Sequence, residues 1–454
     1  MDWVNGIGRA DEWREFMSIN SRTATQPPRS GWQLYFSLPI LSWALYDFAN
    51  TIFSSNINTI FFPFYLDAVI GTNAEMSQVA STFISYANAL ASFFLVVFSP
   101  LYGVWIDRTG QKKSYIVWFT AISIAATFLM GAFALANNNQ EWFGLPAVLF
   151  LVVIMFVIAK FFFNSSLVFY DTMLSDLGSK EEIPLISGYG VAVGYLGTVV
   201  GLSVYLFVQE GSPEQAFIPT AALYLIFSLP LFFFLKDPPK KQTQKKSFLS
   251  GYKEIYTTFK EMRQYKNIFT FMAAYFFLND AIATTIAIMA IYATAVVGFN
   301  GGQFIILYLG STIAAIIGSF IFGYITKKIG SKKAIIAVAI ILITALTIAA
   351  AAVAQWMFWI AGSLIGIALG SMWVTSRTLI VELTPEEKRG QFFGLFAFSG
   401  KVSSIIGPLV YGTITLTLRE YGEFASRVAI SSLIVMALIG LIILFKVKSP
   451  QRAY

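Results

Sequence analysis

The 454-residue chain contains no cysteine and no histidine. The absence of cysteine excludes disulfides, thiolate metal sites and cysteine nucleophiles. The absence of histidine means that no imidazole can bind a metal, relay protons or sense pH. We therefore expect no metal site and no cofactor, and any titration coupled to function must use carboxylates, lysines or tyrosines.

Charged residues are also scarce. They make up 12% of the chain, and hydrophobic residues make up 57%, whereas a soluble domain has about 25% and about 45–50%. A soluble core cannot use this much apolar sequence, so lipid must be the solvent for most of the chain. The first residues lack the short apolar region and cleavage site of a signal peptide, so we expect the first span to remain in the mature protein.

Apolar windows of about 20 residues or more predict twelve membrane-spanning helices. They lie at about 39–69, 77–101, 114–136, 145–174, 185–208, 217–235, 267–298, 303–326, 334–354, 356–381, 391–417 and 426–445. The expected fold class is an all-α integral membrane protein with two pseudo-symmetric six-helix halves. Its expected parts are a cytoplasmic N-terminal segment (1–38), a first bundle (39–236), a cytoplasmic linker (237–266), a second bundle (267–446) and a cytoplasmic tail (447–454).

The positions of the basic residues predict the orientation. Twelve spans place both termini on one side, and 27 of the 31 lysine and arginine residues fall on that side. The positive-inside rule then puts both termini in the cytoplasm. We expect a monomeric multi-pass protein of the cell (inner or plasma) membrane, in contact with lipids. The net charge of +7 is thus a signal of topology, and no nucleic-acid partner is expected.

The central linker carries apolar residues at helical spacing from Phe248 to Met262, with charged residues opposite them. This pattern predicts an amphipathic helix. The helix lies either on the membrane surface or against the cytoplasmic ends of the bundle, and the sequence does not decide between the two.

One motif occurs twice. Gly103–Lys113 reads G-V-W-I-D-R-T-G-Q-K-K, and Gly323–Lys333 reads G-Y-I-T-K-K-I-G-S-K-K, each on a loop between two predicted spans. Such internal repeats are typical of secondary transporters, and we expect a cytoplasmic gate here. Gly103 permits close helix approach, and Asp107 is expected to face the N-terminus of a neighbouring helix, which stabilises its charge. The motif positions are Gly103, Asp107, Arg108, Gly110, Lys112, Lys113, Gly323 and Gly330.

Glycines form a second repeat. Three glycines of the fifth span match three of the eleventh at a constant offset of 206, and Asp176 matches Glu382 at the same offset. Glycines at this density let helices approach closely, and the shared register supports the division into two halves. The matched glycines are Gly188, Gly194 and Gly201 with Gly394, Gly400 and Gly407.

Four charged residues stand out deep inside predicted spans: Asp47, Lys160, Asp280 and Lys401. A charge at mid-bilayer costs about 2.5–3.5 kcal/mol on insertion scales and marks functional positions. Two acids and two bases can form two neutral pairs. Lys160 can meet Asp47 or Asp280, and Lys401 can meet Asp280 if the seventh and eleventh spans are neighbours. Salt bridges that only fix helix packing are the alternative. Asp171 and Arg377, nearer the cytoplasmic ends, fit either a gate or the membrane surface.

Polar side chains also form stripes. Asp47, Asn50 and Ser54 share one face of the first span, and polar clusters recur in spans 4, 7 and 10. These spans are the first helices of the four three-helix units, and a polar stripe on each is what a central aqueous cavity needs. The expected substrate and ion pathway comprises Trp43, Tyr46, Asp47, Asn50, Ser54, Lys160, Asn164, Asn279, Asp280, Thr284, Trp373 and Lys401.

The spans and the G-x-x-x-D-R-x-G-x-K-K loop resemble the major facilitator superfamily. Within it, Ser42–Asn50 (S-W-A-L-Y-D-F-A-N), Tyr275–Asp280 (Y-F-F-L-N-D) and Phe392–Lys401 (F-F-G-L-F-A-F-S-G-K) resemble signatures of the autophagy-related vacuole effluxer group. The resemblance implies a twelve-helix transporter, and fungal members of the group are vacuolar amino-acid exporters. It carries over Asp47, Asn50, Asn279, Asp280 and Lys401 as signature positions without assigned roles. The chain lacks the long loops of fungal members, which favours a bacterial plasma-membrane protein.

The function expected from these features is secondary active transport by alternating access. No nucleotide-binding G-x-x-x-x-G-K loop is present, so an ion gradient or the solute itself must supply the energy, and Asp47 or Asp280 is the expected proton carrier. A cavity with both signs of charge suits a zwitterion such as an amino acid. Export of drugs or other small organic molecules is an alternative, as is a non-transporting receptor or assembly factor with the same fold. No catalytic motif supports an intramembrane enzyme.

Overall fold

The computed structural model describes residues 29, 31–70, 74–136, 140–142, 145–209, 212–237, 250–260, 264–299 and 301–449. The described chain is almost entirely helical, which is how a chain in lipid satisfies its backbone hydrogen bonds. The exception is a two-residue antiparallel ladder between β1 (Glu141–Trp142) and β2 (Leu145–Pro146). The predicted terminal segments lie largely outside the described residues.

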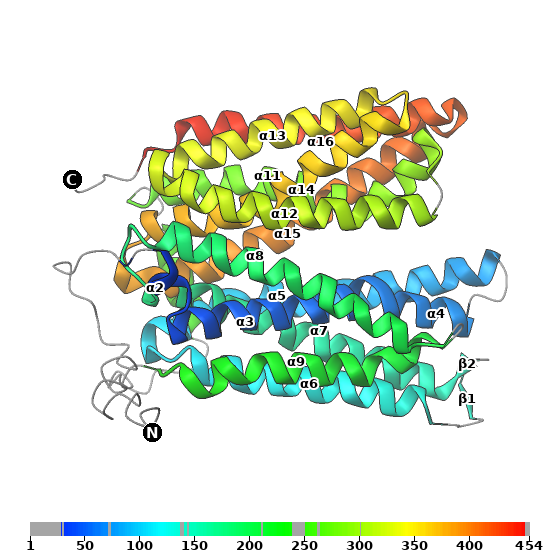
Figure 1. Ribbon diagram of the computed structural model, residues 1–454, viewed down its shortest axis with the longest axis horizontal. Helices are drawn as coiled ribbons and strands as arrows, with labels where there is room; N and C mark the ends of the chain where they lie inside the picture. Colours follow the sequence, from blue (N-terminus) through cyan, green and yellow to red (C-terminus); the bar gives the residue numbers. More distant parts are fainter. Residues whose placement is uncertain are drawn as a thin grey trace, which may run out of the picture.

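The long helices form two groups, one above the other in Figure 1. The first group contains α3 (Leu38–Phe53), α4 (Phe62–Ile70), α5 (Ala74–Thr109), α6 (Lys113–Ala134), α7 (Ala147–Met173), α8 (Ile183–Leu202) and α9 (Phe217–Phe234). The second contains α11 (Lys266–Val297), α12 (Gly301–Ile329), α13 (Ser331–Ala351), α14 (Gln355–Leu383), α15 (Arg389–Thr417) and α16 (Glu423–Lys446). Two short helices, α2 (Gly31–Tyr35) and α10 (Ser250–Lys260), precede the two groups. We call these groups the first and second halves. The start of α3 and the end of α16 lie at the same end of the molecule, the termini end, on the left of Figure 1.

Eleven helices in the described part of the chain are long and apolar enough to cross a membrane. The first predicted span, 39–69, is also helical throughout, but it consists of α3, a π-helical segment (Ser54–Phe61) and α4. Pro63 has no amide hydrogen to donate to the Thr59 carbonyl, so the regular series of α-helical hydrogen bonds is interrupted in this turn. In the same turn, the Thr59 hydroxyl donates to the Ser54 carbonyl, five residues earlier (3.1 Å). The first span therefore carries the wider π-helical turn at a polar stretch, where such turns are often found near functional sites.

The two repeats found in the sequence meet at the interface between the halves. α5 packs on α15, and α8 packs on α12. A Cβ at Gly103 would lie 2.8 Å from Gln391 Cα, and a Cβ at Gly188 would lie 2.9 Å from Gly323 Cα. Only glycine allows backbones to come this close. In each contact, the first glycine of the repeated motif in one half packs against the helix of the glycine repeat in the other half. The two contacts are therefore related by the pseudo-symmetry.

The linker helix α10 packs on the end of α5. Tyr252 Oη donates to the Val97 carbonyl (3.0 Å), and Arg108 donates to Ser250 Oγ (2.8 Å). Of the two placements left open by the sequence, these contacts favour a helix packed on the bundle. The start of the predicted helix, 248–249, lies outside the described residues.

The segment before α3 ties the two halves together at the termini end. Arg29 donates its backbone N–H and Nε to Glu182 Oε1 (2.7 and 3.0 Å) and its Nη2 to Oε2 (3.0 Å). Tyr35 donates to Tyr324 Oη on α12 (2.8 Å). Burial alone would raise the pKa of Glu182, but the hydrogen bonds from Arg29 and Ser179 outweigh it and hold that pKa below its ordinary value.

Glu182→Gln is expected to lower the free energy of unfolding by about 1.5–3 kcal/mol at neutral pH, the range for a hydrogen bond to a charged group. A carboxyl with a lowered pKa stabilises the folded state above its ordinary pKa, and the effect is lost as pH falls through the lowered value. The melting temperatures of wild type and variant should therefore differ at neutral pH and converge in acid. Glu181→Gln, at the exposed neighbouring position, is the control. A difference that persists unchanged in acid would contradict this reading.

Candidate functional site

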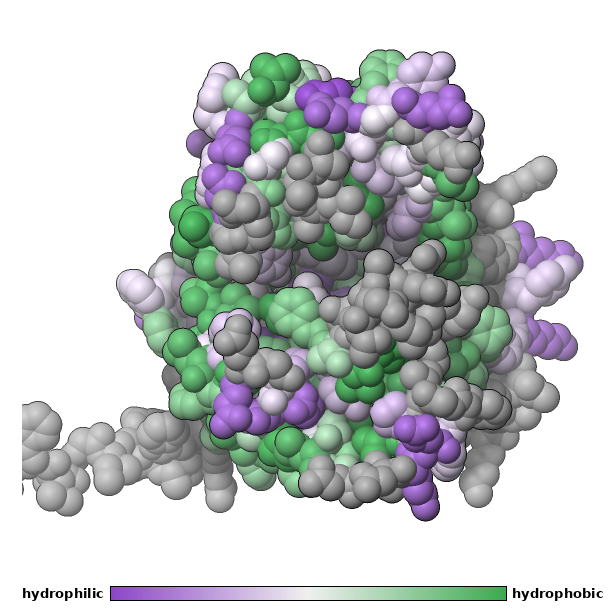
Figure 2. All heavy atoms as spheres, turned by 90° about the vertical axis from the view of Figure 1, so that its right-hand side faces the viewer, coloured by the Kyte–Doolittle hydropathy of each residue, from purple (hydrophilic) through white to green (hydrophobic). Residues whose placement is uncertain are grey.

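A cavity of about 370 Å³ lies between the two halves, a volume within the usual range of about 300–1,000 Å³ for small-molecule sites. Viewed from the end opposite the termini, the surface is hollowed between the two groups of helices (Figure 2). The glycine contacts close the termini end beneath it. Its polar and charged lining residues are Asp47, Asn50, Thr51, Ser54, Asn164, Asp171, Tyr195, Tyr275, Asn279, Arg377, Lys401 and Ser404.

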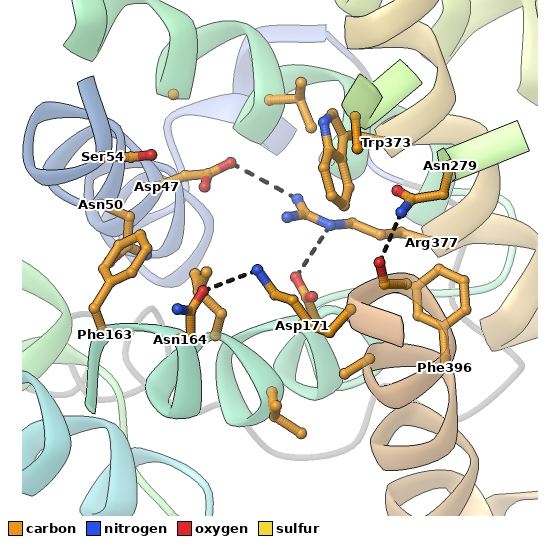
Figure 3. A pocket seen from close by; sticks show the side chains of 18 of the residues that line it. Asp47, Asn50, Ser54, Phe163, Asn164, Asp171, Asn279, Trp373, Arg377 and Phe396 are labelled. Atoms are coloured by element: carbon orange, nitrogen blue, oxygen red, sulfur yellow. Dashed lines mark hydrogen bonds and ion pairs between the residues drawn. The ribbon is translucent and has the colours of Figure 1, made fainter. Parts of the chain in front are cut away.

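Arg377, on α14, is the central cation of the cavity (Figure 3). Its Nε lies 3.0 Å from Asp171 Oδ1 on α7, and its Nη1 lies 3.7 Å from Asp47 Oδ2 on α3. The guanidinium carbon also lies 5.6 Å from the centre of the Trp373 ring, within cation–π range. Within the described part of the chain, neither Nε nor Nη1 has hydrogen-bond geometry to a partner. Both ion pairs cross from one half to the other, so relative movement of the halves must change them.

Lys401, on α15, makes a second polar contact across the halves. Its Nζ donates to Asn164 Oδ1 on α7 (3.0 Å), and Asn164 Nδ2 donates to the Lys160 carbonyl one turn earlier (2.9 Å). The expected pairing of Lys401 with Asp280 is wrong, because Lys401 points into the cavity and Asp280 does not line it. The expectation for Asp47 is also corrected, since the base that lies beside it is Arg377.

Two asparagines on opposite walls differ in how firmly they are held. On α11, Asn279 accepts from Tyr275 Oη (3.1 Å) and donates to the Gly400 carbonyl (2.9 Å), so both ends of its amide are fixed. On α3, Asn50 Oδ1 accepts from Tyr224 Oη (3.1 Å), but its buried Nδ2 has no partner among the described residues. A buried amide donor without a partner costs about 1–3 kcal/mol. Asn50 therefore offers the cavity a hydrogen-bond donor.

Two aromatic residues assigned to the pathway lie outside the cavity. Trp43 is fully buried one turn closer to the termini end than Asp47, where its ring stacks on Tyr170 (centroids 4.7 Å apart). Tyr46 is rotated away from the cavity and bonds to the hydroxyls of Thr120 and Ser166. Both side chains support the floor and wall of the cavity and do not line it.

Three polar residues of the predicted pathway are also displaced from the cavity wall. Asp280 is 1% exposed and accepts from Gly407 N–H on α15 (2.9 Å). Thr284 lies on the same face, one turn further along α11, and is fully buried. Lys160 lies one turn beyond Asn164, with its Nζ 5.7 Å from the centre of the Phe156 ring. Of the predicted pathway, Asp47, Asn50, Ser54, Asn164, Asn279, Trp373 and Lys401 line the cavity.

The repeated motif lies mostly on helix and not on a loop. Gly103, Asp107 and Arg108 belong to α5, Lys113 begins α6, and Gly323 belongs to α12. The loop positions Gly110 and Gly330 have positive φ (69° and 89°), which glycine adopts without strain. The expected position of Asp107 is observed: its carboxylate accepts from the backbone N–H groups of Gly390 and Gln391 (2.7 and 2.9 Å) at the start of α15.

Acidic residues at matched positions tie neighbouring spans together at the termini end. Lys112 Nζ lies 2.6 Å from Asp176 Oδ2 at the end of α7. In the second half, Ser331 at the start of α13 donates to Glu382 at the end of α14. Asp237 was not predicted to act here, but its carboxylate accepts from the backbone N–H groups of Lys112, Lys113 and Ser114 (2.7, 2.8 and 2.8 Å). It therefore occupies the N-terminus of α6, where negative charge is favourable.

Arg377 and Asp171 are the cavity residues whose place the sequence analysis predicted poorly. Both were assigned to the cytoplasmic ends of their spans, yet both line the cavity. The signal was present, because Arg377 falls inside the apolar window 356–381, where a charge is costly.

Comparison with known proteins agrees with this architecture. The family model described as "Vacuole effluxer Atg22 like" matches residues 73–453. The chain belongs to this family. An uncharacterized MFS-type transporter, YxiO of Bacillus subtilis, is 26% identical over 415 residues, covering 89% of this chain and 93% of that protein. Autophagy-related protein 22 of Yarrowia lipolytica is 27% identical over 269 residues, covering 50% of this chain and 45% of that protein.

Solved structures with the same fold are transporters. A bacterial homologue of the iron transporter ferroportin, in an outward-facing state, has a TM-score of 0.70 at 13% identity, covering 90% of this chain and 98% of that one. The fucose:proton symporter of E. coli has a TM-score of 0.65 at 12% identity, covering 90% and 99%. At these identities the likeness shows the fold alone. The chain is thus a multi-pass, all-α transporter of the major facilitator superfamily, in its Atg22-like group, and proteins of this superfamily are not enzymes.

Proposed function

We propose that this transporter moves a small zwitterionic solute, an amino acid or a similar metabolite, by alternating access. The observation that carries the proposal is the set of charges at the floor of the cavity. Asp47 and Asp171 come from the first half, and Arg377 and Lys401 come from the second. A solute that binds among them contacts both halves at once, which is the requirement for linking solute binding to their relative movement.

The cavity presents both signs of charge to a solute. A carboxylate can take the donors of Arg377 that lack hydrogen-bond geometry, together with Lys401. An ammonium group of the solute can replace the guanidinium beside Asp47. Of the two ion pairs of Arg377, the one with Asp47 is the longer, at 3.7 Å. The aromatic lining residues Phe163, Trp373 and Phe396 can enclose an apolar side chain. A purely hydrophobic drug would leave the charged floor unpaired, which is costly.

The two glycine contacts support movement by rocking. They close the termini end through α5 with α15 and α8 with α12, and matched elements of the two halves supply both. Separation at these contacts would open the cavity toward the termini while its far end closes. Because Asp107 fixes the start of α15, it strengthens the state in which the termini end is closed.

Orientation and energy source complete the proposal. The concentration of basic residues at the termini end supports a cytoplasmic location of both termini in a cell membrane, and each chain contains a complete cavity, which supports a monomer. A proton gradient is the energy source we propose, with an intramembrane carboxyl group, Asp47 or Asp280, as the carrier. Protonation of Asp47 would weaken its attraction for Arg377 and so favour release of the halves.

Thermal stability tests the proposed substrate class. A ligand that binds the native protein stabilises it by about 2.7 kcal/mol at 100 times its dissociation constant. The panel contains amino acids, betaines, sugars and cationic drugs. We expect amino acids to raise the melting temperature of the wild type, and we expect them to leave the melting temperature of the Lys401→Met variant unchanged. Lys448→Met, at an exposed position beyond α16, should keep the wild-type response. A rise with cationic drugs alone would favour the drug-export alternative.

A further inference from the structure

Asp280 lies at a buried contact between α11 and α15 that is separate from the cavity. Its Oδ1 accepts from Gly407 N–H, but its buried Oδ2 has no hydrogen-bond partner among the described residues. The buried hydroxyl of Thr284 interacts with this carboxyl group but likewise has no partner at full hydrogen-bond geometry among the described residues. Both side chains face the same glycine, since a Cβ at Gly407 would lie 2.8 Å from Asp280 Oδ1 and 3.0 Å from Thr284 Cβ. Two polar groups with unused hydrogen-bonding capacity therefore lie side by side.

Three basic side chains on the surrounding helices are engaged elsewhere. On α15, Lys401 donates to Asn164; on α14, Arg377 lies between Asp47 and Asp171; on α16, Arg427 donates to the Ala350 carbonyl. Tyr275, on α11 itself, donates to Asn279, and Tyr411 lies one turn beyond Gly407 on α15. Among the described residues no basic side chain pairs with Asp280. An ionised carboxylate in such a place costs far more than a neutral carboxylic acid.

The first half supplies an internal comparison. Gly201, the counterpart of Gly407 in the glycine repeat, faces the neutral side chain of Asn56. Asn56 Nδ2 donates to the Gly201 carbonyl (2.9 Å) and to Thr220 Oγ1 (3.0 Å). An amide is thus sufficient to pack a helix against this glycine. The second half has an acid in the same role, and an acid differs from an amide in that it can release and accept a proton.

From this arrangement we infer that Asp280 is the proton-carrying group of the transporter, at a site distinct from the solute cavity. The inference deepens the proposed function and rests on it for the coupling to transport. In the state described here Asp280 holds the proton on Oδ2. The few oxygens present, from Asp280 and Thr284, suit a proton better than a sodium ion, which like other hard cations needs a fuller shell of oxygen ligands.

Release of the proton has a structural consequence on α15. The O–H bond at Oδ2 breaks, the proton passes to water entering from the cavity beside Asn279, and the remaining charge stays on the carboxylate. A carboxylate accepts hydrogen bonds more strongly than the neutral acid, so the hydrogen bond from Gly407 N–H becomes stronger. In a regular helix this N–H would donate to a backbone carbonyl four residues earlier. Pro408 already interrupts that series of helical hydrogen bonds. The protonation state of Asp280 is thereby linked to the shape of the helix that carries Lys401 into the cavity.

Infrared difference spectroscopy tests the site without any solute. In spectra of the purified full chain recorded across a pH titration, we expect the carbonyl stretch of a buried protonated carboxylic acid. The band should be lost in Asp280→Asn, retained in Asp280→Glu, and retained with a shifted frequency in Thr284→Val, which removes only the neighbouring hydroxyl. An unchanged band in Asp280→Asn would overturn the assignment whatever the protein transports.

Proteoliposomes containing a pH-sensitive dye test the coupling. With an equimolar mixture of the twenty protein amino acids outside, wild type should change the internal pH as solute enters, and Asp280→Asn should lose this change while still exchanging labelled amino acids between equal pools. A pH change that persists in Asp280→Asn, or accumulation driven by a sodium gradient at fixed pH, would overturn the inference. If wild type exchanges no amino acid, the proposed substrate class fails, and the infrared band still decides whether Asp280 holds the proton.

Discussion

Arg377→Gln is expected to abolish transport and to lower the free energy of unfolding by about 3 kcal/mol. Removing one partner of a buried ion pair costs about 3–5 kcal/mol, and the lower end applies because the cavity admits water. The substitution leaves Asp47 and Asp171 facing each other without the cation that lies 3.7 and 3.0 Å from them. It also removes the donor that we propose for the solute carboxylate.

The two effects of Arg377→Gln can be separated by a second substitution. In the double variant with Asp171→Asn, one of the uncompensated charges is gone, so the melting temperature should recover while transport stays lost. Arg427→Gln is the matched control, because Arg427 bonds to the Ala350 carbonyl away from the cavity and should leave transport unchanged. Exchange of the amino acid with the largest thermal shift is the measurement. Exchange at the wild-type rate in Arg377→Gln would contradict the role given to this residue.

Gly103→Ala is expected to shift the protein away from the state with a closed termini end. The added Cβ would lie 2.8 Å from Gln391 Cα and closer still to the Gly390 carbonyl oxygen. These are backbone atoms at the start of α15, which cannot move aside as a side chain can, so α5 and α15 must separate. The same separation lengthens the bonds from Asp107 to that helix end. The state open toward the termini should gain population at the expense of the state described here.

A single cysteine makes this shift measurable. The natural chain has none, so Ala283→Cys, on the cavity wall, introduces the only thiol. With Gly103→Ala, modification by a membrane-impermeant reagent should become faster from the termini side and slower from the opposite side. Gly412→Ala is the control for helix propensity, because no described atom beyond the helix's own nearby backbone lies within 4 Å of the added Cβ. Equal rates in the two glycine variants would show that the contact does not hold the closed state.

The sequence predicted best what depends on local pattern and on the solvent. Lipid requires apolar helical spans, so the windows found the helices, including the tight connection between α13 and α14. Asp107 was placed correctly because a carboxylate in this motif is stabilised at a helix N-terminus. The repeated glycines indicated close approach, although which helices they join follows only from the contacts between α5 and α15 and between α8 and α12.

The sequence failed where depth or rotation about a helix axis decides the result. Trp43 and Asp47 share a face, but the closed end of the molecule leaves Trp43 beneath the cavity. Asn279 and Asp280 are adjacent and both bond to α15, yet the rotation of one residue leaves Asn279 on the cavity wall and Asp280 outside it. The partner of Asp47 was misjudged because Arg377 is more than 300 positions away in the other half, and no local pattern reports such a contact.

The measurement that tests the central claim most directly is the reactivity of the Ala283→Cys thiol in the otherwise natural chain, in oriented vesicles. The thiol should react rapidly from the side opposite the termini in the state described here. During active exchange of solute it should also react from the termini side, and saturating solute at both faces should change the ratio of the two rates. Reaction from the opposite side alone, under every condition including active exchange, would contradict alternating access through this cavity.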